Sequence, residues 1–367
     1  MKPPFIRKAK KVISGAGHFQ RKDNIRLGAS YFGSRHLKHL KKDMQEMVES
    51  GCNFVVHTMS EEDMTYYADT MTEVVRVSKE VGLEVFLDPW GVGRAFGGEA
   101  FSNFISQNPQ CRQRLSLAEG ELFADKACLN STSFRRLMEG WIELAASTGA
   151  SGVFWDEPHL YYGELIPLFG KKQEVWACAC HTCQWLFKER FGHDMPRDFT
   201  EEVIQFRQAT ILRFIQSLSQ EATKKGLKNA LCLFPLHDPR YGVYRWEEAV
   251  KDKNLDIFGT DPYWLCFNRA VEDFVREVSR EVVALCNKYG KEPQIWIQGF
   301  RIPTGREEEV GQAIRTAYGE GVRNLAVWSF QGAYYMSHLR CDRPEVVWKR
   351  VTEGYKELRA RCHECQP

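Results

Sequence analysis

The sequence lacks a long apolar run and lacks an excess of charge of either sign. No stretch approaches the roughly 20 apolar residues that span a bilayer, and the basic segment 1–19 never reaches the apolar core of a secretory signal. We therefore expect a cytoplasmic protein with no membrane partner. Fifty Lys and Arg against 48 Asp and Glu give a net charge of +2, so no general attraction for nucleic acid is expected.

The composition is that of a folded globular protein. A hydrophobic fraction of 43% and an aromatic fraction of 13% over 367 residues suffice for a large core. Twelve cysteines in a chain of this length fit buried thiols or a metal site better than a disulfide framework, which is typical of small secreted domains. The oligomeric state is open, and a homo-oligomer is one option.

Apolar runs rich in β-branched and aromatic residues recur along the chain and alternate with helical patterns that have charged faces. The expected strands lie at 25–31, 53–58, 83–89, 152–158, 230–235, 255–262, 294–300 and 324–330. The clearest helices are expected at 36–50, 61–80, 132–148, 269–288 and 305–319. Eight such units predict a (β/α)8 TIM barrel, with residues 1–367 forming one catalytic domain.

Two intervals between the expected strands are long. They cover about residues 91–131 after the third strand and about 159–226 after the fourth. In a barrel of this kind both become long loops at the C-terminal ends of the strands, where active sites are built. Neither interval has the composition of an independent domain.

Two adjacent carboxylates end the fourth expected strand. The run 152–155 reads as a buried strand, and Pro158 stops it because proline cannot donate to a strand ladder. Asp156 and Glu157 therefore fall on the rim of the barrel. Two acidic groups at the end of a buried strand repel each other and cost desolvation, which indicates a functional role.

Other polar and aromatic residues follow the remaining strands. Asp261 is a candidate catalytic carboxylate, and the candidate substrate-binding residues are His57, Asp88, Trp90, His237, Tyr263, Trp264, Gln298 and Trp328. Carboxylates and amides among flat rings suit a sugar, whose hydroxyls form hydrogen bonds while its C–H faces pack on the rings. Taken singly, the Asp-Pro dipeptides can be plain strand ends and the tryptophans plain core residues.

A cysteine cluster follows the fourth strand. Cys178, Cys180 and Cys183 form a C-x-C-x-x-C motif, which is a strong start to a tetrahedral zinc site, and Cys128 is the best fourth ligand. We expect a structural Zn2+ in the insertion at about 159–226. The pair Cys362 and Cys365 is the competing source of ligands.

At these residues the sequence resembles the family 42 β-galactosidases, which are glycoside hydrolases with (β/α)8 barrels. The matching elements are Cys128-Leu129-Asn130-Ser131, Trp155-Asp156-Glu157 and the C-x-C-x-x-C motif, in the same order and within about residues 125–195. The resemblance implies a four-cysteine structural zinc and Glu157 as the acid/base. Asp156 replaces the asparagine of the family, and Gln298 lies where the family has its nucleophilic glutamate on the seventh strand.

The sequence therefore predicts a glycoside hydrolase that acts on a glycoside or an oligosaccharide, with Glu157 as the general acid. Because an amide cannot be a covalent nucleophile, two mechanisms remain. Asp261, with Asp88 in reserve, could activate water in an inverting reaction. Alternatively, Asp156 could orient a substrate acetamido group that attacks the anomeric carbon.

Two other functions remain open. A sugar-binding barrel without catalysis is compatible with Gln298 on the seventh strand. A metal-dependent hydrolase could use His57, Asp88, His237 and Asp238 as ligands, although the sequence has no closely spaced histidine pair typical of such sites.

Overall fold

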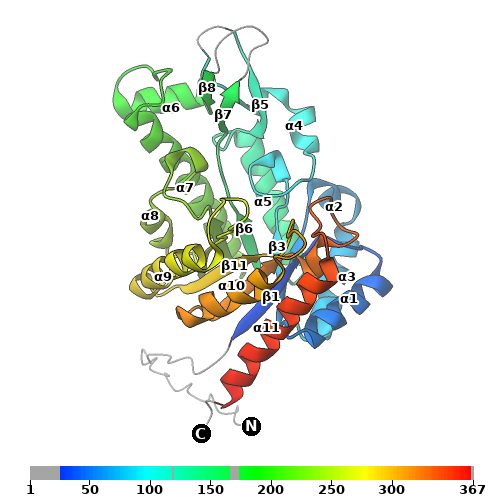
Figure 1. Cartoon of the computed structure of the whole chain (residues 1–367). Coiled ribbons are helices and arrows are strands. Elements are labelled where there is room, and N and C mark those ends of the chain that lie inside the picture. Colours follow the sequence, from blue (N-terminus) through cyan, green and yellow to red (C-terminus); the bar gives the residue numbers. More distant parts are fainter. Residues whose placement is uncertain (1–24, 118–119, 166–172, 365–367) are drawn as a thin grey trace, which may run out of the picture.

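The computed structural model describes residues 25–117, 120–165 and 173–364 (Figure 1). Eight parallel strands close into a barrel in the order β1-β12-β11-β10-β9-β6-β3-β2. The barrel strands are β1 (Arg26–Tyr31), β2 (Phe54–Thr58), β3 (Glu84–Asp88), β6 (Gly152–Asp156), β9 (Lys228–Leu233), β10 (Ile257–Thr260), β11 (Glu292–Gln298) and β12 (Asn324–Trp328). The predicted (β/α)8 TIM barrel is confirmed.

Helices follow each barrel strand and cover the outside of the barrel (Figure 1). They are α1 (Leu37–Glu49), α2 (Glu61–Tyr66), α3 (Ala68–Glu80), α5 (Thr132–Ser147), α7 (Glu201–Lys224), α8 (Trp246–Val250), α9 (Val271–Tyr289), α10 (Glu308–Gly319) and α11 (Pro344–Glu364). The helix expected over 61–80 is divided in two, because Tyr67 has φ −127° and ψ 22°, outside the helical range. No helix among the described residues is long and apolar enough to cross a bilayer.

The two long connections carry small antiparallel hairpins where only loops were predicted. The connection after β3 contains α4 (Asn103–Gln107) and pairs β4 (Arg112–Arg114) with β5 (Phe123–Ala127). The connection after β6 pairs β7 (Tyr162–Leu165) with β8 (Gln173–Trp176) and continues into α6 (His181–Phe191). In Figure 1 these elements lie together above the barrel. Their strands are short and largely polar, so they lack the apolar alternation that reveals a strand in a sequence.

Side chains alternate along each barrel strand, and this alternation aims the carboxylates inward. On β6, Val153 and Trp155 pack in the layer between barrel and helices, whereas Phe154 belongs to the core inside the barrel. The Trp155 indole donates to Asn229 Oδ1 at 3.0 Å on the outer face. Asp156, one residue further along, therefore points into the barrel with Phe154.

The interior of the barrel is filled in layers. At the N-terminal ends of the strands Arg26 forms ion pairs with Glu84 at 2.7 Å and with Glu292 at 3.1 Å. Its guanidinium also lies 5.2 Å from the Phe54 ring centroid. Above it the interior is apolar, with Trp296 as its bulkiest member. These apolar side chains fill the N-terminal half of the barrel interior, so only the C-terminal end is open for a site.

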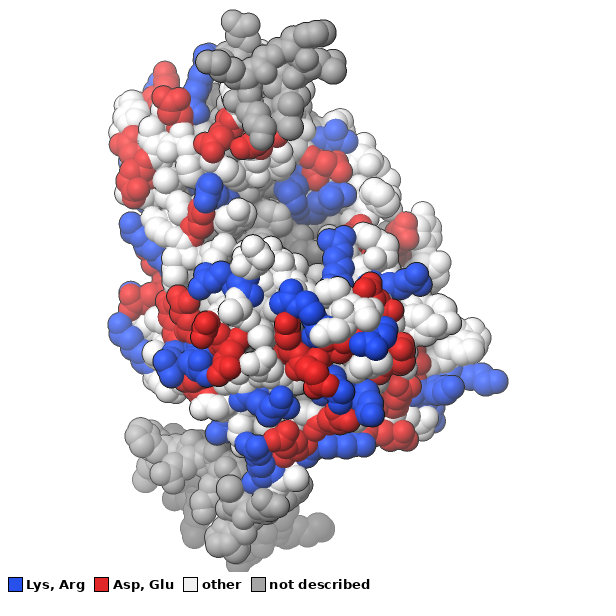
Figure 2. All heavy atoms as spheres, in the orientation of Figure 1, with Lys and Arg blue, Asp and Glu red and all other residues white. Residues whose placement is uncertain are grey.

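Charged side chains of both signs are mixed over the face of the barrel shown in Figure 2, in keeping with the near-zero net charge. Many of them pair along helices, as Arg276 does with Glu272. This face therefore carries no extended basic track.

Candidate active site

A pocket of about 170 Å³ opens at the C-terminal ends of the barrel strands. Its lining residues are Phe32, Trp90, Gly98, Glu99, Asp156, Glu157, Asp261, Tyr263, Phe300, Trp328 and Leu339. The three candidate catalytic carboxylates thus meet in one pocket, together with three of the candidate aromatic residues. A concave site with convergent acidic groups and aromatic walls is suited to a small polar ligand.

Glu157 leaves the end of β6 through an unusual backbone conformation. Its φ is +40°, which is rare for a residue other than glycine, and its amide donates to Cys232 O on β9 at 3.0 Å. Pro158 follows directly, so the chain turns away from the sheet while the side chain enters the pocket. Such strained positions are concentrated at functional sites.

Burial raises the pKa of Glu157 from 4.5 to about 7, while a side-chain hydrogen bond with Asp261 and the charge of Lys126 act in the opposite direction. A carboxyl group with this pKa holds a proton close to neutral pH and can also release it. These are the properties required of a general acid.

Asp156 and Asp88 lie close enough to each other to interact electrostatically. Burial raises the pKa of both carboxyl groups well above the usual range; the neighbouring Glu157 adds to the rise at Asp156, and Asp156 adds to it at Asp88. Asp88 is fully buried, and neither of its carboxyl oxygens has a hydrogen-bond partner among the described residues. It does not line the pocket, so the structure does not place it as a direct substrate ligand.

Asp261 follows β10 and is 3% exposed. Its side chain shares a hydrogen bond with Glu157, and burial together with that neighbour raises its pKa well above the usual range. In inverting glycosidases the two carboxyl groups stand roughly 6.5–9.5 Å apart, which leaves room for the attacking water. A pair joined by a hydrogen bond lies closer together than this, and the role of Asp261 as the base stays a prediction.

Aromatic rings form the walls of the pocket. Phe32 stacks between Trp90, at a centroid distance of 5.3 Å, and Trp328, at 5.7 Å. Tyr263 meets Phe300 edge to face at 5.0 Å. The buried Trp90 Nε1 has no hydrogen-bond partner within the described part of the chain. The walls can therefore pack against apolar faces of a ligand.

Besides Asp88, four of the predicted substrate-binding residues are placed outside the pocket lining. His57 lies on the outer face of β2, where its Nε2 is 2.9 Å from Ser78 Oγ, and burial lowers its pKa to about 3. His237 contacts Glu281 on α9 at 2.8 Å. The indole of Trp264 donates to Glu309 Oε2 at 2.6 Å. These three contacts give the side chains structural roles outside the pocket lining.

Gln298 is the fourth of these predicted substrate-binding residues outside the pocket lining. It is fully buried at the end of β11, and its amide is fully used: Oε1 accepts from the Leu265 amide at 3.1 Å, and Nε2 donates to Phe300 O at 3.2 Å. Gln298 thus ties β11 to the segment after β10, and it does not line the pocket.

The ligand set suggested for a metal-dependent hydrolase is not assembled. His57 lies outside the barrel and Asp88 inside it, while Asp238 caps the turn Pro239–Tyr241 and pairs with Arg240. Within residues 25–117, 120–165 and 173–364, the cysteine cluster is the only group of three or more potential ligands close enough to share a metal ion.

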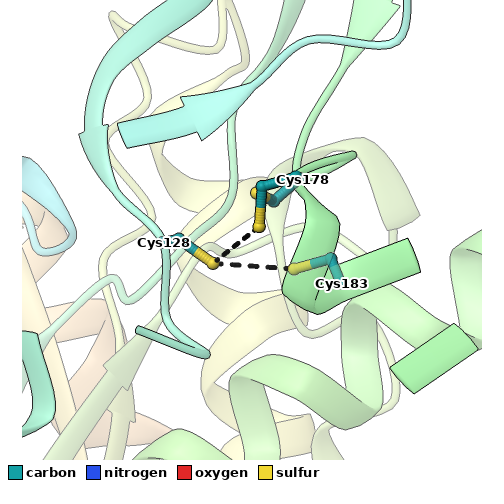
Figure 3. A group of neighbouring side chains, drawn as sticks. Cys128, Cys178 and Cys183 are labelled. Carbon is teal, nitrogen blue, oxygen red and sulfur yellow. Dashed lines mark hydrogen bonds between the residues drawn. The ribbon is translucent and has the colours of Figure 1, made fainter. Parts of the chain in front are cut away.

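The four predicted zinc ligands do come together. The sulfur atoms of Cys128, Cys178, Cys180 and Cys183 all lie within 4.8 Å of one another. Cys128 Sγ is 3.5 Å from Cys183 Sγ and 3.7 Å from Cys180 Sγ, and Figure 3 shows the labelled thiols converging from two segments. A tetrahedral ion with bonds of about 2.3 Å to sulfur requires edges of roughly 3.8 Å.

The cluster joins the two long connections. Cys128 directly follows β5, whereas the C-x-C-x-x-C motif lies between β8 and the first turn of α6. Asn130 Nδ2 donates to Cys183 Sγ at 3.3 Å, a contact that favours a thiolate. Cys362 instead packs on α11 with its sulfur 3.7 Å from the Tyr318 hydroxyl, and Cys365 lies outside the described residues.

Three residues at or near the site were not predicted from the sequence. Phe32 directly follows β1 and fills the centre of the aromatic wall. Glu99 lines the pocket from the long connection after β3, and Lys126 on β5 is close enough to Glu157 to affect its pKa. Phe32 could have been predicted, because it directly follows the first expected strand, as the other pocket residues follow theirs. Nothing in the sequence marks Glu99 or Lys126, because both reach the site through the fold of the connection after β3.

No family model matches this chain, and no curated protein matches it. Solved structures share its fold. An endo-1,4-β-mannanase from Rhizomucor miehei aligns with a TM-score of 0.59 at 9% identity, over 92% of this chain and 95% of that one. An endo-β-1,4-mannanase from Thermotoga petrophila gives 0.52 at 8% identity, over 93% and 77%.

A GH5_18 protein from Bifidobacterium longum, solved with Manβ1-4GlcNAc, gives a TM-score of 0.54 at 9% identity, over 94% of this chain and 80% of that chain. At such identities the likeness establishes the common barrel fold and nothing further. The resemblance to the family 42 β-galactosidases stays a prediction.

Proposed function

We propose that the chain is a glycoside hydrolase in which Glu157 protonates the leaving glycosidic oxygen. The observation that carries the proposal is the position of Glu157, which lies in a pocket with aromatic walls beside Asp156 and Asp261 and has a pKa of about 7. The fold is one that known glycoside hydrolases use, which is compatible with the proposal.

In the proposed reaction the sugar packs against Trp90 and Trp328, and its hydroxyls bond to the carboxyl groups on the pocket floor. As the bond between the anomeric carbon and the leaving oxygen breaks, the Glu157 proton moves to that oxygen. Asp261 holds the Glu157 side chain in place through their hydrogen bond and shares its proton. Asp156 stands where it can bond to a hydroxyl or an acetamido group.

We further propose that the cysteine cluster holds one structural Zn2+. All four sulfur ligands are supplied by the chain, so such an ion has no open position for a water or a substrate. Its contribution is to the fold: it ties the loop after β5 to the start of α6. Lys126 lies two residues before Cys128, so the same tie fixes the strand that carries Lys126 toward Glu157.

A panel of p-nitrophenyl glycosides of hexoses and N-acetylhexosamines tests the proposal. We expect turnover of at least one member by the unmodified chain. General-acid catalysis contributes a factor of roughly 10² to 10⁴, so Glu157→Gln should lose that much for a substrate whose leaving group needs protonation. Glu139→Gln, an exposed change of the same type on α5, should leave the rate unaltered. Equal rates for all three proteins on an alkyl glycoside of the sugar that is cleaved would overturn the role of Glu157.

A sugar-binding barrel without catalysis is the second candidate. Gln298 favours it, because β11 supplies an amide bonded to Leu265 and Phe300 where retaining glycosidases of the resembled family have a nucleophile. Saturable sugar binding by calorimetry, with no turnover of any member of the panel, would favour this function over hydrolysis.

A further inference from the structure

The proposed hydrolysis needs a group that activates the attacking water, and the carboxylates on the floor of the pocket are poorly placed for this. Asp261 is joined to Glu157 by a hydrogen bond, and Asp156 is its neighbour in sequence. Asp88 does not line the pocket, and the amide of Gln298 is occupied by Leu265 and Phe300. Glu99 is the one remaining carboxylate among the lining residues.

Glu99 reaches the pocket from the connection after β3, and its side chain contacts the segment after β12. Its Oε2 accepts from Ser337 Oγ at 3.0 Å, and its Oε1 is 3.6 Å from His338 Nε2. Both partners belong to the segment after β12. In the closed strand order β12 lies four strands from β6 in either direction, so it is diametrically across from the strand that ends at Glu157.

Glu157 is anchored by different elements. Its amide bonds to Cys232 on β9, and its side chain bonds to Asp261 after β10. Glu157 is thus held by contacts with β9 and with the residue after β10, whereas the Glu99 carboxylate is held by contacts with the segment after β12. An inverting hydrolysis requires two carboxyl groups that are held by separate parts of the site, because the sugar and the attacking water must both fit between them.

We propose that Glu99 is the general base of an inverting hydrolysis, an inference that rests on the proposed function. Glu99 accepts a proton from water, and the water oxygen forms a bond to the anomeric carbon. The bond from that carbon to the leaving oxygen breaks on the opposite face, and the leaving oxygen takes the proton of Glu157. The products are a hemiacetal of inverted configuration and an alcohol.

The surroundings of Glu99 suit this role. Its side chain is 35% exposed, so water can reach it, while Ser337 and His338 fix its orientation. Ser337 is a positioning residue in this account: Ser337→Ala should lower kcat about tenfold with little change in KM, since the base is still present but less well oriented.

The test uses the p-nitrophenyl glycoside that the unmodified chain cleaves fastest. Glu99→Gln should lower kcat by roughly 10² to 10⁴. Glu121→Gln is the matched control, because Glu121 lies in the same connection, is 59% exposed and pairs only at the surface with Arg114. Proton NMR of the first product should show the inverted anomer, and azide should restore turnover to Glu99→Ala by forming the inverted glycosyl azide.

A kcat of Glu99→Gln within about threefold of the unmodified chain, or a product of retained configuration, would overturn the role of Glu99 and leave Glu157 as proton donor. Full activity of Glu99→Gln beside a severe loss in Asp156→Asn, on N-acetylhexosaminides only, would assign the reaction to substrate assistance. Absence of turnover by the unmodified chain on the whole panel would overturn the proposed function, and the role of Glu99 with it.

Discussion

The α-carbon of Gly97 lies directly against the carboxyl group of Asp156: a Cβ built on Gly97 would come within 2.1 Å of Asp156 Oδ2. The Gly97 amide also donates to Asp156 O at 2.9 Å. The connection after β3 is thus held to the end of β6 by both backbone and side chain. Only glycine permits this approach, because any larger residue would occupy the position of the carboxyl oxygen.

Gly97→Ala should therefore damage the site while leaving the barrel intact. The added methyl group must push the Asp156 side chain aside, and misplacement by about 1 Å at a catalytic site can cost on the order of 10²-fold in rate. Steady-state kinetics and thermal unfolding measure the two effects. Gly140→Ala is the control, because a Cβ there meets no atom within 4 Å and alanine favours the helix. Unchanged kinetics in Gly97→Ala would contradict the placement of Asp156.

Loss of one cysteine ligand should remove the metal. We expect Cys183→Ser to reduce bound zinc from about one per chain to near zero and to lower the free energy of unfolding by at least about 2 kcal/mol, because metal binding and folding of such a site are coupled. Cys266→Ser should change neither, since Cys266 is exposed and outside the cluster. Metal analysis and chemical denaturation are the measurements. Absence of zinc from the unmodified chain would refute the site.

Gln298→Glu should destabilise the protein without creating a nucleophile. A carboxylate can still accept from the Leu265 amide, but it cannot donate to Phe300 O, and an unsatisfied buried carbonyl costs about 1–3 kcal/mol. Denaturant unfolding should show this loss. Trapping of a glycosyl-enzyme ester at position 298 with a 2-fluoro glycoside would contradict the structural role of Gln298.

The raised pKa of Glu157 makes stability depend on pH. The folded state holds a proton on Glu157 up to about pH 7, whereas the unfolded chain releases it near pH 4.5. The protonated Glu157 therefore contributes to the free energy of unfolding at low pH, and this contribution is lost as the pH rises from about 4.5 to about 7. The rise from 4.5 to about 7 corresponds to roughly 3 kcal/mol.

Glu157→Gln removes this proton. The free energy of unfolding of the variant minus that of the unmodified chain should therefore be larger at pH 8 than at pH 5, by up to about 3 kcal/mol. Denaturant titrations at the two pH values measure the difference, and Glu139→Gln should show none. The same relative stability of Glu157→Gln at both pH values would mean that Glu157 is not buried as the structure has it.

The regular parts of the fold could be predicted from the sequence because the strands are apolar and recur at helix-length intervals. Every expected strand lies in the barrel, and Pro158 marks the end of β6 as inferred. The convergence of the cysteines was also predictable, because the spacing of Cys178, Cys180 and Cys183 keeps these three close together in any fold. Asp156, Glu157 and Asp261 met because parallel strands all end on one rim.

The site residues that were predicted wrongly or not predicted depend on tertiary contacts. His57 lies near the end of β2 and Trp264 follows β10, but their side chains point outward to Ser78 and Glu309, and strand position alone does not set the face. Glu99 reaches the pocket through the long connection after β3, and its carboxylate accepts a hydrogen bond from Ser337, a residue far away in the sequence. Such contacts depend on tertiary structure and leave no local pattern.

The most direct measurement of the role of Glu157 compares two leaving groups on one sugar. For a 2,4-dinitrophenyl glycoside, whose leaving group departs without a proton, Glu157→Gln should keep kcat/KM within about tenfold of the unmodified chain. For the alkyl glycoside of the same sugar it should lose roughly 10² to 10⁴, the usual contribution of a general acid. Equal losses on both substrates, or no loss on either, would contradict proton donation by Glu157.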